Sequence, residues 1–361
     1  MQQRLLSLSL VSLFGWLGQS GCAGPDVPVF DVTDRVPGVR APRSASCDDQ
    51  DPTRCLLPFP SNVFTVKDAQ TKTGLRVAVQ SQELVGGDDA AALNRADGFS
   101  LVTPIVTAFA ASVSPLPVAK QGEGSLRVLL AQPDAADFGK PVPLRYAVEQ
   151  GQGERGVTES FLFAYPLRPL APASDYVAVV LDDLPIAEGN RPAASVQTQV
   201  ALGLRPPQTQ SEAELFAYHA PTRKVLKQAG IDLARVLRVW DFTTRSEDDA
   251  HRVLATMRQG ALQAVAAGQV KVAIDQVVSS TNPQVALTVL GHVEGLPQYI
   301  EPTPGSALRF DASGRPVSIG SREAPFRIVI PTGSGNYRFI MYGHGTGGAY
   351  TDSTFDTEIA G

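Results

Sequence analysis

Alternating apolar and polar positions run through the middle of the chain and predict short β-strands. Turn clusters rich in Gly, Pro, Asp and Gln separate the segments that carry this pattern, which are 109–113, 125–130, 143–148, 160–165 and 175–181. The run from Tyr176 to Leu181 is apolar on both faces, so we expect a central, buried strand there. Regular spacing of such strands predicts a β-sandwich.

After residue 204 the apolar positions follow helical spacing. Residues 211–230 predict either two short helices or one helix kinked at Pro221, with Gly230 as the stop. A strand is expected over 236–244. Ser246 then caps a second helix whose first turn is acidic. Its apolar stripe is expected to make core contacts and consists of Val253, Met257, Ala261, Leu262 and Val265.

The last part of the chain returns to strand patterns, expected over 284–291, 325–331 and 336–342. The third of these runs straight into a glycine-rich turn. That turn comprises Gly343, His344, Gly345, Thr346, Gly347 and Gly348.

The first residues predict an export signal. Arg4 precedes an apolar run, Leu5 to Leu17, which is too short to span a membrane, a task that takes about 20 apolar residues. Ser20-Gly21-Cys22 resembles the lipobox of bacterial lipoproteins, in which the cysteine is lipidated, although Gln19 stands where that motif usually has an aliphatic residue. We expect a lipid anchor on Cys22 and a place at the outer membrane. The alternative is an ordinary cleaved signal peptide.

Cysteine usage fits a protein outside the cytoplasm. With Cys22 lipidated, Cys47 and Cys55 are left as a pair, which an oxidising compartment would join in a disulfide. No second pair of Cys or His lies near them, so we expect no metal there. The net charge of −5 and the lack of a basic stretch exclude nucleic-acid binding, and we expect no cofactor.

Composition and pattern together predict an α+β, multidomain protein. The 28 Pro and 32 Gly residues favour turns and short strands over helical bundles. The expected division is a signal peptide (1–22), a flexible tether (23–54), a β-rich domain (55–205), a helical connecting segment (206–268) and a C-terminal segment (269–361). The string Leu167-Arg-Pro-Leu-Ala-Pro-Ala-Ser-Asp-Tyr176 resembles bacterial immunoglobulin-like domains, which implies that the β-rich domain is immunoglobulin-like. The motifs described next imply that the C-terminal segment is an incomplete α/β-hydrolase domain.

The turn from Gly343 to Gly348 is the feature that points most directly to chemistry. In α/β-hydrolases the turn after the third strand offers backbone N–H groups to the oxyanion that forms when a serine attacks an ester. Glycines suit this task because a side chain would block the approach of the backbone to the substrate. The alternatives are an ordinary glycine-rich turn and a His344 that merely tethers the loop. Phosphate-binding motifs are absent.

Five strings in the sequence resemble bacterial virulence-factor lipases and lipoprotein lysophospholipases. They are Cys55-Leu-Leu-Pro-Phe-Pro-Ser-Asn-Val-Phe64, Thr73-Gly-Leu-Arg76, Ala92-Leu-Asn-Arg-Ala-Asp-Gly-Phe-Ser100, Val239-Trp-Asp-Phe-Thr-Thr244 and Tyr342-Gly-His-Gly345. In that family a β-rich domain precedes an α/β-hydrolase domain. The resemblance implies that residues 343–348 are the oxyanion loop and that the substrate is a lipid or another ester. We interpret Trp240 and Asp241 as structural residues.

The sequence departs from that family in one decisive respect. It contains no Gly-x-Ser-x-Gly nucleophile elbow, and the four histidines, His219, His251, His292 and His344, form no recognisable triad. We therefore expect the chain to be the N-terminal part of a longer ester hydrolase, inactive alone. The alternative is a non-catalytic envelope lipoprotein with an immunoglobulin-like binding domain. A metal-dependent hydrolase is not expected, because no metal-binding motif is present along the chain.

Overall fold

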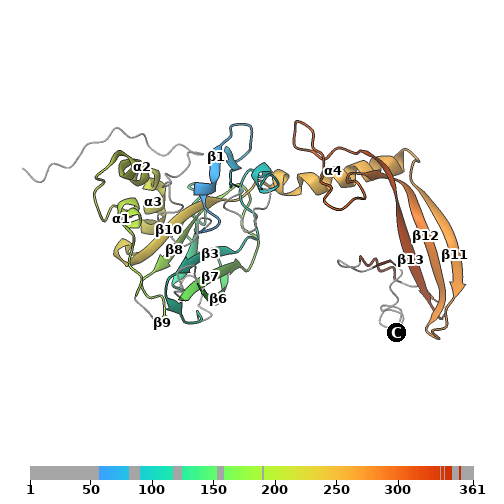
Figure 1. Ribbon diagram of the computed structural model, residues 1–361, viewed down its shortest axis with the longest axis horizontal. Coiled ribbons are helices and arrows are strands. Elements are labelled where there is room, and N and C mark those ends of the chain that lie inside the picture. The colour runs from blue at the N-terminus through green and yellow to red at the C-terminus, as the bar shows by residue number, and fades with distance from the viewer. Residues whose placement is uncertain are drawn as a thin grey trace, which may run out of the picture.

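The structure is a computed structural model that describes residues 57–80, 90–116, 124–152, 158–188, 191–333, 335, 336, 338–343, 349 and 350. The signal peptide, the tether and all three cysteines (Cys22, Cys47 and Cys55) lie outside the described residues. The described chain is a mixed α+β protein whose sheets are mostly antiparallel (Figure 1).

Two three-stranded antiparallel sheets form the centre of what we call the β-rich unit, which includes helices α1 to α3. Their strand orders are β10-β8-β5 and β3-β7-β6. Their bounds are Ile105–Phe109 (β3), Leu126–Leu130 (β5), Leu144–Gln152 (β6), Thr158–Pro166 (β7), Asp175–Leu181 (β8) and Val236–Thr243 (β10). β10, which the sequence pattern assigns to the connecting segment, is therefore part of a sheet of the β-rich unit.

The sheet that contains β8 is buried between two other layers. One face packs on the other sheet through a common core that includes Ile105, Leu162 and Phe242. The opposite face packs on helices, where Val179 of β8 shares a cluster with Leu226. Every residue of β8 after Asp175 is buried, which confirms the central strand predicted from its unbroken apolar run.

Shorter elements complete this unit. The strand pairs are β1 (Thr65–Lys67) with β2 (Leu75–Val77), and β4 (Ser112–Val113) with β9 (Ile186–Glu188). Single 3-10 turns lie at Asn62–Phe64 (η1), Leu93–Arg95 (η4) and Leu233–Arg235 (η5). The sequence pattern predicted one strand over 109–113, where the structure has the last residue of β3 and, after a break, β4. It did not predict the other short pieces, most of which are too short to show a period.

Residues 211–230 form two short helices and not one kinked helix, namely α2 (Gln210–Tyr218) and α3 (Ala220–Gln228). A further helix, α1 (Val196–Leu202), lies in the part of the chain that the sequence pattern assigned to the β-rich domain, and it was not predicted. Pro221 lies in the first turn of α3, where its missing N–H costs no helical hydrogen bond. Gly230 has a φ of +66°, so it ends α3 in the left-handed conformation that glycine adopts without strain.

Helix α4 (Glu247–Ala266) begins as predicted, with Ser246 accepting a hydrogen bond from the backbone N–H of Asp249. Its apolar stripe does not form the expected core contacts, because Leu262 and Val265 are exposed. The only buried residues of α4 are Asp249 and Ala264. Figure 1 shows the reason: α4 leaves the β-rich unit and runs to a second sheet, so most of its surface faces solvent. Within the described part of the chain, no helix combines the length and the apolar character needed to cross a membrane.

At the far end of α4 lies the C-terminal sheet, an antiparallel sheet of order β11-β12-β13 (Figure 1). Its strands are β11 (Lys271–Ser279), β12 (Val285–Gln298) and β13 (Gly320–Pro331). The sequence pattern missed β11. The pairing register shifts between Ile274 and Gln276, and this bulge breaks the two-residue period on which the sequence prediction depends.

One face of the C-terminal sheet is apolar, and the other is mixed. The register places nine apolar side chains on one face: Val272, Ile274, Val277, Leu287, Val289, Val293, Phe326, Ile328 and Ile330. Among them Val272, Ile274 and Val277 are 66%, 54% and 56% exposed. The other face carries the charged residues Lys271, His292, Glu294 and Glu323, together with the apolar residues Val278, Leu290 and Val329. An apolar sheet face thus lies open to water in the described structure.

Candidate functional site

The glycine-rich turn predicted to bind an oxyanion follows the C-terminal sheet in the chain. Gly343 is described and is exposed, whereas His344, Gly345, Thr346, Gly347 and Gly348 lie outside the described residues. The structure therefore describes the segment that precedes the turn and the first residue of the turn, Gly343.

The segment before Gly343 is not the strand that the sequence pattern predicts. Its described residues belong to none of the sheets. Four consecutive large apolar side chains in this segment are exposed to solvent. Phe339, Ile340, Met341 and Tyr342 are 77%, 67%, 84% and 55% exposed. A strand exists only when a neighbouring strand takes up its backbone hydrogen bonds, and alternation in the sequence cannot supply that neighbour.

Nothing in its surroundings requires a glycine at position 343. A Cβ placed there would meet no atom within 4 Å, and the backbone is not in the left-handed region that favours glycine. Local packing and local backbone strain therefore do not explain this glycine.

A buried polar network surrounds Asp241 in the β-rich unit. Its Oδ2 accepts hydrogen bonds from Asn62 Nδ2 at 2.9 Å and from the Tyr218 hydroxyl at 2.8 Å. Asn62 also accepts from the backbone N–H of Thr243 at 3.0 Å and donates to the Thr243 hydroxyl at 3.1 Å. Thr243 in turn donates to Asp175 Oδ1 at 2.6 Å. The network ties the N-terminal turn η1 to strands β8 and β10 and to helix α2.

This network borders a cavity of about 170 Å³ that is lined in part by Thr73, Asp175, Tyr176, Thr222, Asp241 and Thr243. The two carboxylates there already accept hydrogen bonds from neighbouring side chains. They act as fixed acceptors that hold the strands together. The neighbouring Trp240 is buried and donates its indole N–H to the Pro60 carbonyl at 2.9 Å. Trp240 and Asp241 thus have the structural roles assigned to them from the sequence.

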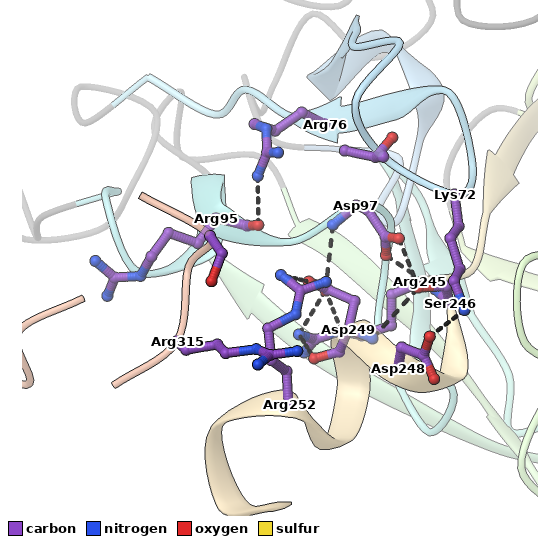
Figure 2. Close-up of polar contacts among 12 residues, drawn as sticks. Lys72, Arg76, Arg95, Asp97, Arg245, Ser246, Asp248, Asp249, Arg252 and Arg315 are labelled. Atoms are coloured by element: carbon purple, nitrogen blue, oxygen red, sulfur yellow. Dashed lines mark hydrogen bonds and ion pairs between the residues drawn. The ribbon is translucent and has the colours of Figure 1, made fainter. Parts of the chain in front are cut away.

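A second polar cluster fastens the start of α4 to the β-rich unit (Figure 2). Asp97 is buried, and its two oxygens accept hydrogen bonds from the backbone N–H of Ser246 at 2.9 Å and from the Ser246 hydroxyl at 2.6 Å. Asp249 Oδ2 accepts from Arg245 at 2.7 Å and from the backbone N–H of Asp97 at 3.3 Å. On the exposed rim, Lys72 pairs with Asp248.

The strings that resemble lipases account for much of this internal bonding. Asn94 bonds both backbone groups of Val79, donating to the carbonyl at 2.7 Å and accepting from the N–H at 2.9 Å. Gly98 lies against the backbone of residues 244 and 245. Phe99 is a core residue. The sequence strings were visible as motifs, but their structural role depends on their partners, which lie 15 positions away for Asn94 and more than 100 positions away for Gly98.

The buried carboxyl of Asp97 predicts a pH dependence of stability. Burial raises the pKa of this carboxyl above its ordinary value, although the hydrogen bonds from Ser246 oppose the shift. Because the pKa is higher in the folded than in the unfolded chain, the folded chain binds the proton more tightly. The resulting stabilisation is complete below the unfolded pKa of about 3.9 and is lost as pH rises through the folded pKa.

We therefore expect Asp97→Asn to gain stability relative to the parent chain as pH rises from about 4 upward, because the amide has no proton to lose. The free energy of unfolding of both chains, measured by urea titration at a series of pH values, checks this difference. A constant difference across the series would show that Asp97 has the same pKa in both states.

The described histidines lie apart in the fold. His219 is buried between α2 and α3, with Nδ1 3.1 Å from the Thr222 hydroxyl. His251 is exposed on α4, and its Nδ1 lies 3.0 Å from the Glu247 carbonyl. His292 lies on β12. His344 lies outside the described residues.

Comparison of the chain with protein-family models, with curated proteins and with solved structures gave no match.

Proposed function

We propose that this chain is the N-terminal part of an exported serine carboxylic-ester hydrolase, in which an immunoglobulin-like domain precedes an α/β-hydrolase domain. The observation that carries the proposal is the open apolar face of the C-terminal sheet, together with the exposed apolar run from Phe339 to Tyr342 that follows this sheet in the chain and leads into a glycine-rich turn.

The exposed apolar face is evidence that a further layer of structure packs on this sheet in the proposed hydrolase domain. Burying one Val, Leu, Ile or Phe side chain stabilises a protein by roughly 1.5–3 kcal/mol. A face of nine such side chains is therefore costly to leave in water, and soluble proteins rarely expose a contiguous patch of that kind. α/β folds cover both faces of their sheet with helices.

The run from Phe339 to Tyr342 fits an inner strand of such a sheet. Strands that are buried on both faces read as continuous apolar runs, and this run is apolar at each of its four positions. In the proposed domain a parallel neighbour would take up its hydrogen bonds and align the backbone at Gly343.

An oxyanion-binding turn also supplies the reason for glycine that the local structure lacks. Its backbone N–H groups must come within hydrogen-bonding distance of the developing negative oxygen, and a side chain at the turn would hold the ester away. In this proposal Gly343 to Gly348 stabilise the oxyanion. The serine nucleophile would come from a nucleophile elbow, which the sequence does not contain, and its acid and histidine from segments that follow that elbow.

The proposed location is the cell envelope, with the mature chain held by a lipid on Cys22 and a disulfide joining Cys47 and Cys55. It rests on the apolar run and the Ser20-Gly21-Cys22 string of the first residues, and on the even pair of cysteines that remains. An ester of a membrane lipid would be within reach of an enzyme anchored in this way.

The test is hydrolysis of short and medium acyl p-nitrophenyl esters by two proteins, the chain from Ala23 to Gly361 and the complete product of the natural gene. We expect turnover in the complete product only. Gly345→Asp in that product is expected to reduce kcat by about 100-fold or more, as does the loss of an oxyanion donor in other hydrolases.

Circular dichroism of the Gly345→Asp variant controls for folding. Turnover that survives this substitution would contradict the oxyanion role of the turn. No turnover in the complete product would contradict the hydrolase proposal and favour a non-catalytic envelope lipoprotein.

A further inference from the structure

The mixed face of the C-terminal sheet gathers four metal-ligating side chains from three strands. Asp275 comes from β11, His292 and Glu294 from β12, and Glu323 from β13. One ligand atom each of His292, Glu294 and Glu323 lies within 4.8 Å of the other two. The expectation of no metal site considered ligand spacing along the chain, and this cluster forms only when the strands pair.

The sheet geometry explains how these side chains meet. His292 and Glu294 are two residues apart on one strand, so they point to the same face. His292 pairs with Pro325, and Glu323, two residues away on β13, faces the same side. The register of β12 and β13 shifts between Val293 and Leu296, beside Glu294. The bulge in β11 places Asp275 as the extra residue, which lets its side chain reach His292.

The two ring nitrogens of His292 have different neighbours. Nδ1 donates to Asp275 Oδ2 at 3.0 Å, and Nε2 lies 3.2 Å from Glu294 Oε1. This is the arrangement of many metal-binding histidines, in which a carboxylate accepts from one nitrogen and aims the other at the ion. The hydrogen bonds to Asp275 and then to Glu294, with the charge of Glu323, hold the pKa of the imidazole above its usual range.

The cluster has an excess of negative charge. Among the described residues, no lysine or arginine forms an ion pair with Asp275, Glu294 or Glu323, and a single imidazole is the counterion of the first two. Even with His292 protonated, the four groups sum to −2, and Lys271, the cross-strand neighbour of Glu294, offsets only one of these charges. A divalent cation would neutralise this charge.

We propose that His292, Glu294 and Glu323 bind a divalent transition-metal ion, with Zn²⁺ preferred, and that Asp275 positions His292. One imidazole nitrogen and two carboxylate oxygens are donors that Zn²⁺ accepts, and water fills the position that faces solvent. Binding displaces the proton from Nε2 into solution, while Nδ1 keeps its hydrogen bond to Asp275. The ion would tie β12 to β13. This inference does not depend on ester hydrolysis.

The test is calorimetric titration of Zn²⁺ into the chain from Ala23 to Gly361 after removal of metals with EDTA. We expect one binding event that His292→Ala removes. Asp275→Asn is expected to weaken that event by about 10–100-fold, the usual loss when a residue that positions a ligand is changed. His251→Ala is the matched control, because this exposed histidine on α4 is not part of the cluster, and it should leave the affinity unchanged.

If Cys47 and Cys55 bound zinc, that zinc would be bound equally by the parent chain and by His292→Ala. It would therefore not contribute to the difference between the two proteins. Circular dichroism shows whether each variant is folded. As a second readout, Zn²⁺ should raise the Tm of the parent chain more than that of His292→Ala. Identical zinc titrations in the parent chain and His292→Ala would overturn the proposal. So would Ca²⁺ binding that persists in His292→Ala without a zinc event, since that marks an acidic surface without a nitrogen ligand.

Discussion

Gly98→Ala is expected to lower the free energy of unfolding of the β-rich unit by about 3 kcal/mol, the upper range for overpacking a tightly packed site. A Cβ at this position would lie 2.7 Å from the backbone nitrogen of Arg245 and 2.7 Å from the carbonyl carbon of Thr244. Both are backbone atoms and cannot rotate away. Two segments of the backbone are held together here, because the Phe99 N–H donates to the Thr243 carbonyl at 2.9 Å and the Phe99 carbonyl accepts from the Arg245 N–H at 2.8 Å.

Urea unfolding followed by tryptophan fluorescence measures this effect in the right part of the molecule. Of the two tryptophans, Trp16 lies in the predicted signal peptide, so in the mature chain the signal comes from Trp240, which is buried in the β-rich unit. Gly343→Ala is the matched control, since open space surrounds that position, and its unfolding midpoint should equal that of the parent chain. An unchanged midpoint for Gly98→Ala would mean that the two backbones can separate at no cost.

Asn62→Ala is expected to destabilise the β-rich unit by a similar amount, about 3 kcal/mol, because it leaves buried polar groups without partners. The buried backbone N–H of Thr243 loses its acceptor, and the buried Asp241 carboxylate loses one of its donors. Because both groups are buried, neither can form a replacement hydrogen bond with solvent water. A chain with this substitution should unfold at a markedly lower urea concentration, with Trp240 fluorescence again as the signal.

Two further variants separate the possible causes of that loss. Asn336→Ala removes the same amide from an exposed position and should have no effect. Asn62→Asp keeps the size and the acceptor for Thr243 but places a second carboxylate beside Asp241, so it should be destabilising at neutral pH and less so in acid. A stable Asn62→Ala chain would show that water reaches this network and satisfies it.

Much of the candidate site could be named from the sequence, but its surroundings could not. The glycine-rich turn is visible because Gly and His recur at short spacing in one segment. The open apolar face is not visible, since Val272, Ile274 and Val277 lie on either side of a bulge and belong to a strand that the pattern misses. The His292 cluster is not visible either, because Asp275 and Glu323 are 17 and 31 positions from His292 and meet it only through register.

Local features were the ones that the sequence determined. The strands from Leu126 to Leu181 alternate or run apolar as isolated segments, and the Ser246 cap with its acidic first turn marks the start of α4 within four residues. Turns, caps and periods depend on neighbours within a few positions, so they can be predicted before any pairing is known.

Only the tertiary structure decided which of these segments are buried and what they contact. The stripe of α4 has the same helical period as a core helix, yet α4 leads away from the β-rich unit, Leu262 and Val265 stay exposed, and no residue of the stripe is fully buried. Residues 336–342 read as a strand, yet their described part has no place in a sheet. The physical reason is the same in both cases. An apolar period shows that a segment can be buried, but burial and strand pairing need a partner surface, and only the fold determines where that surface lies.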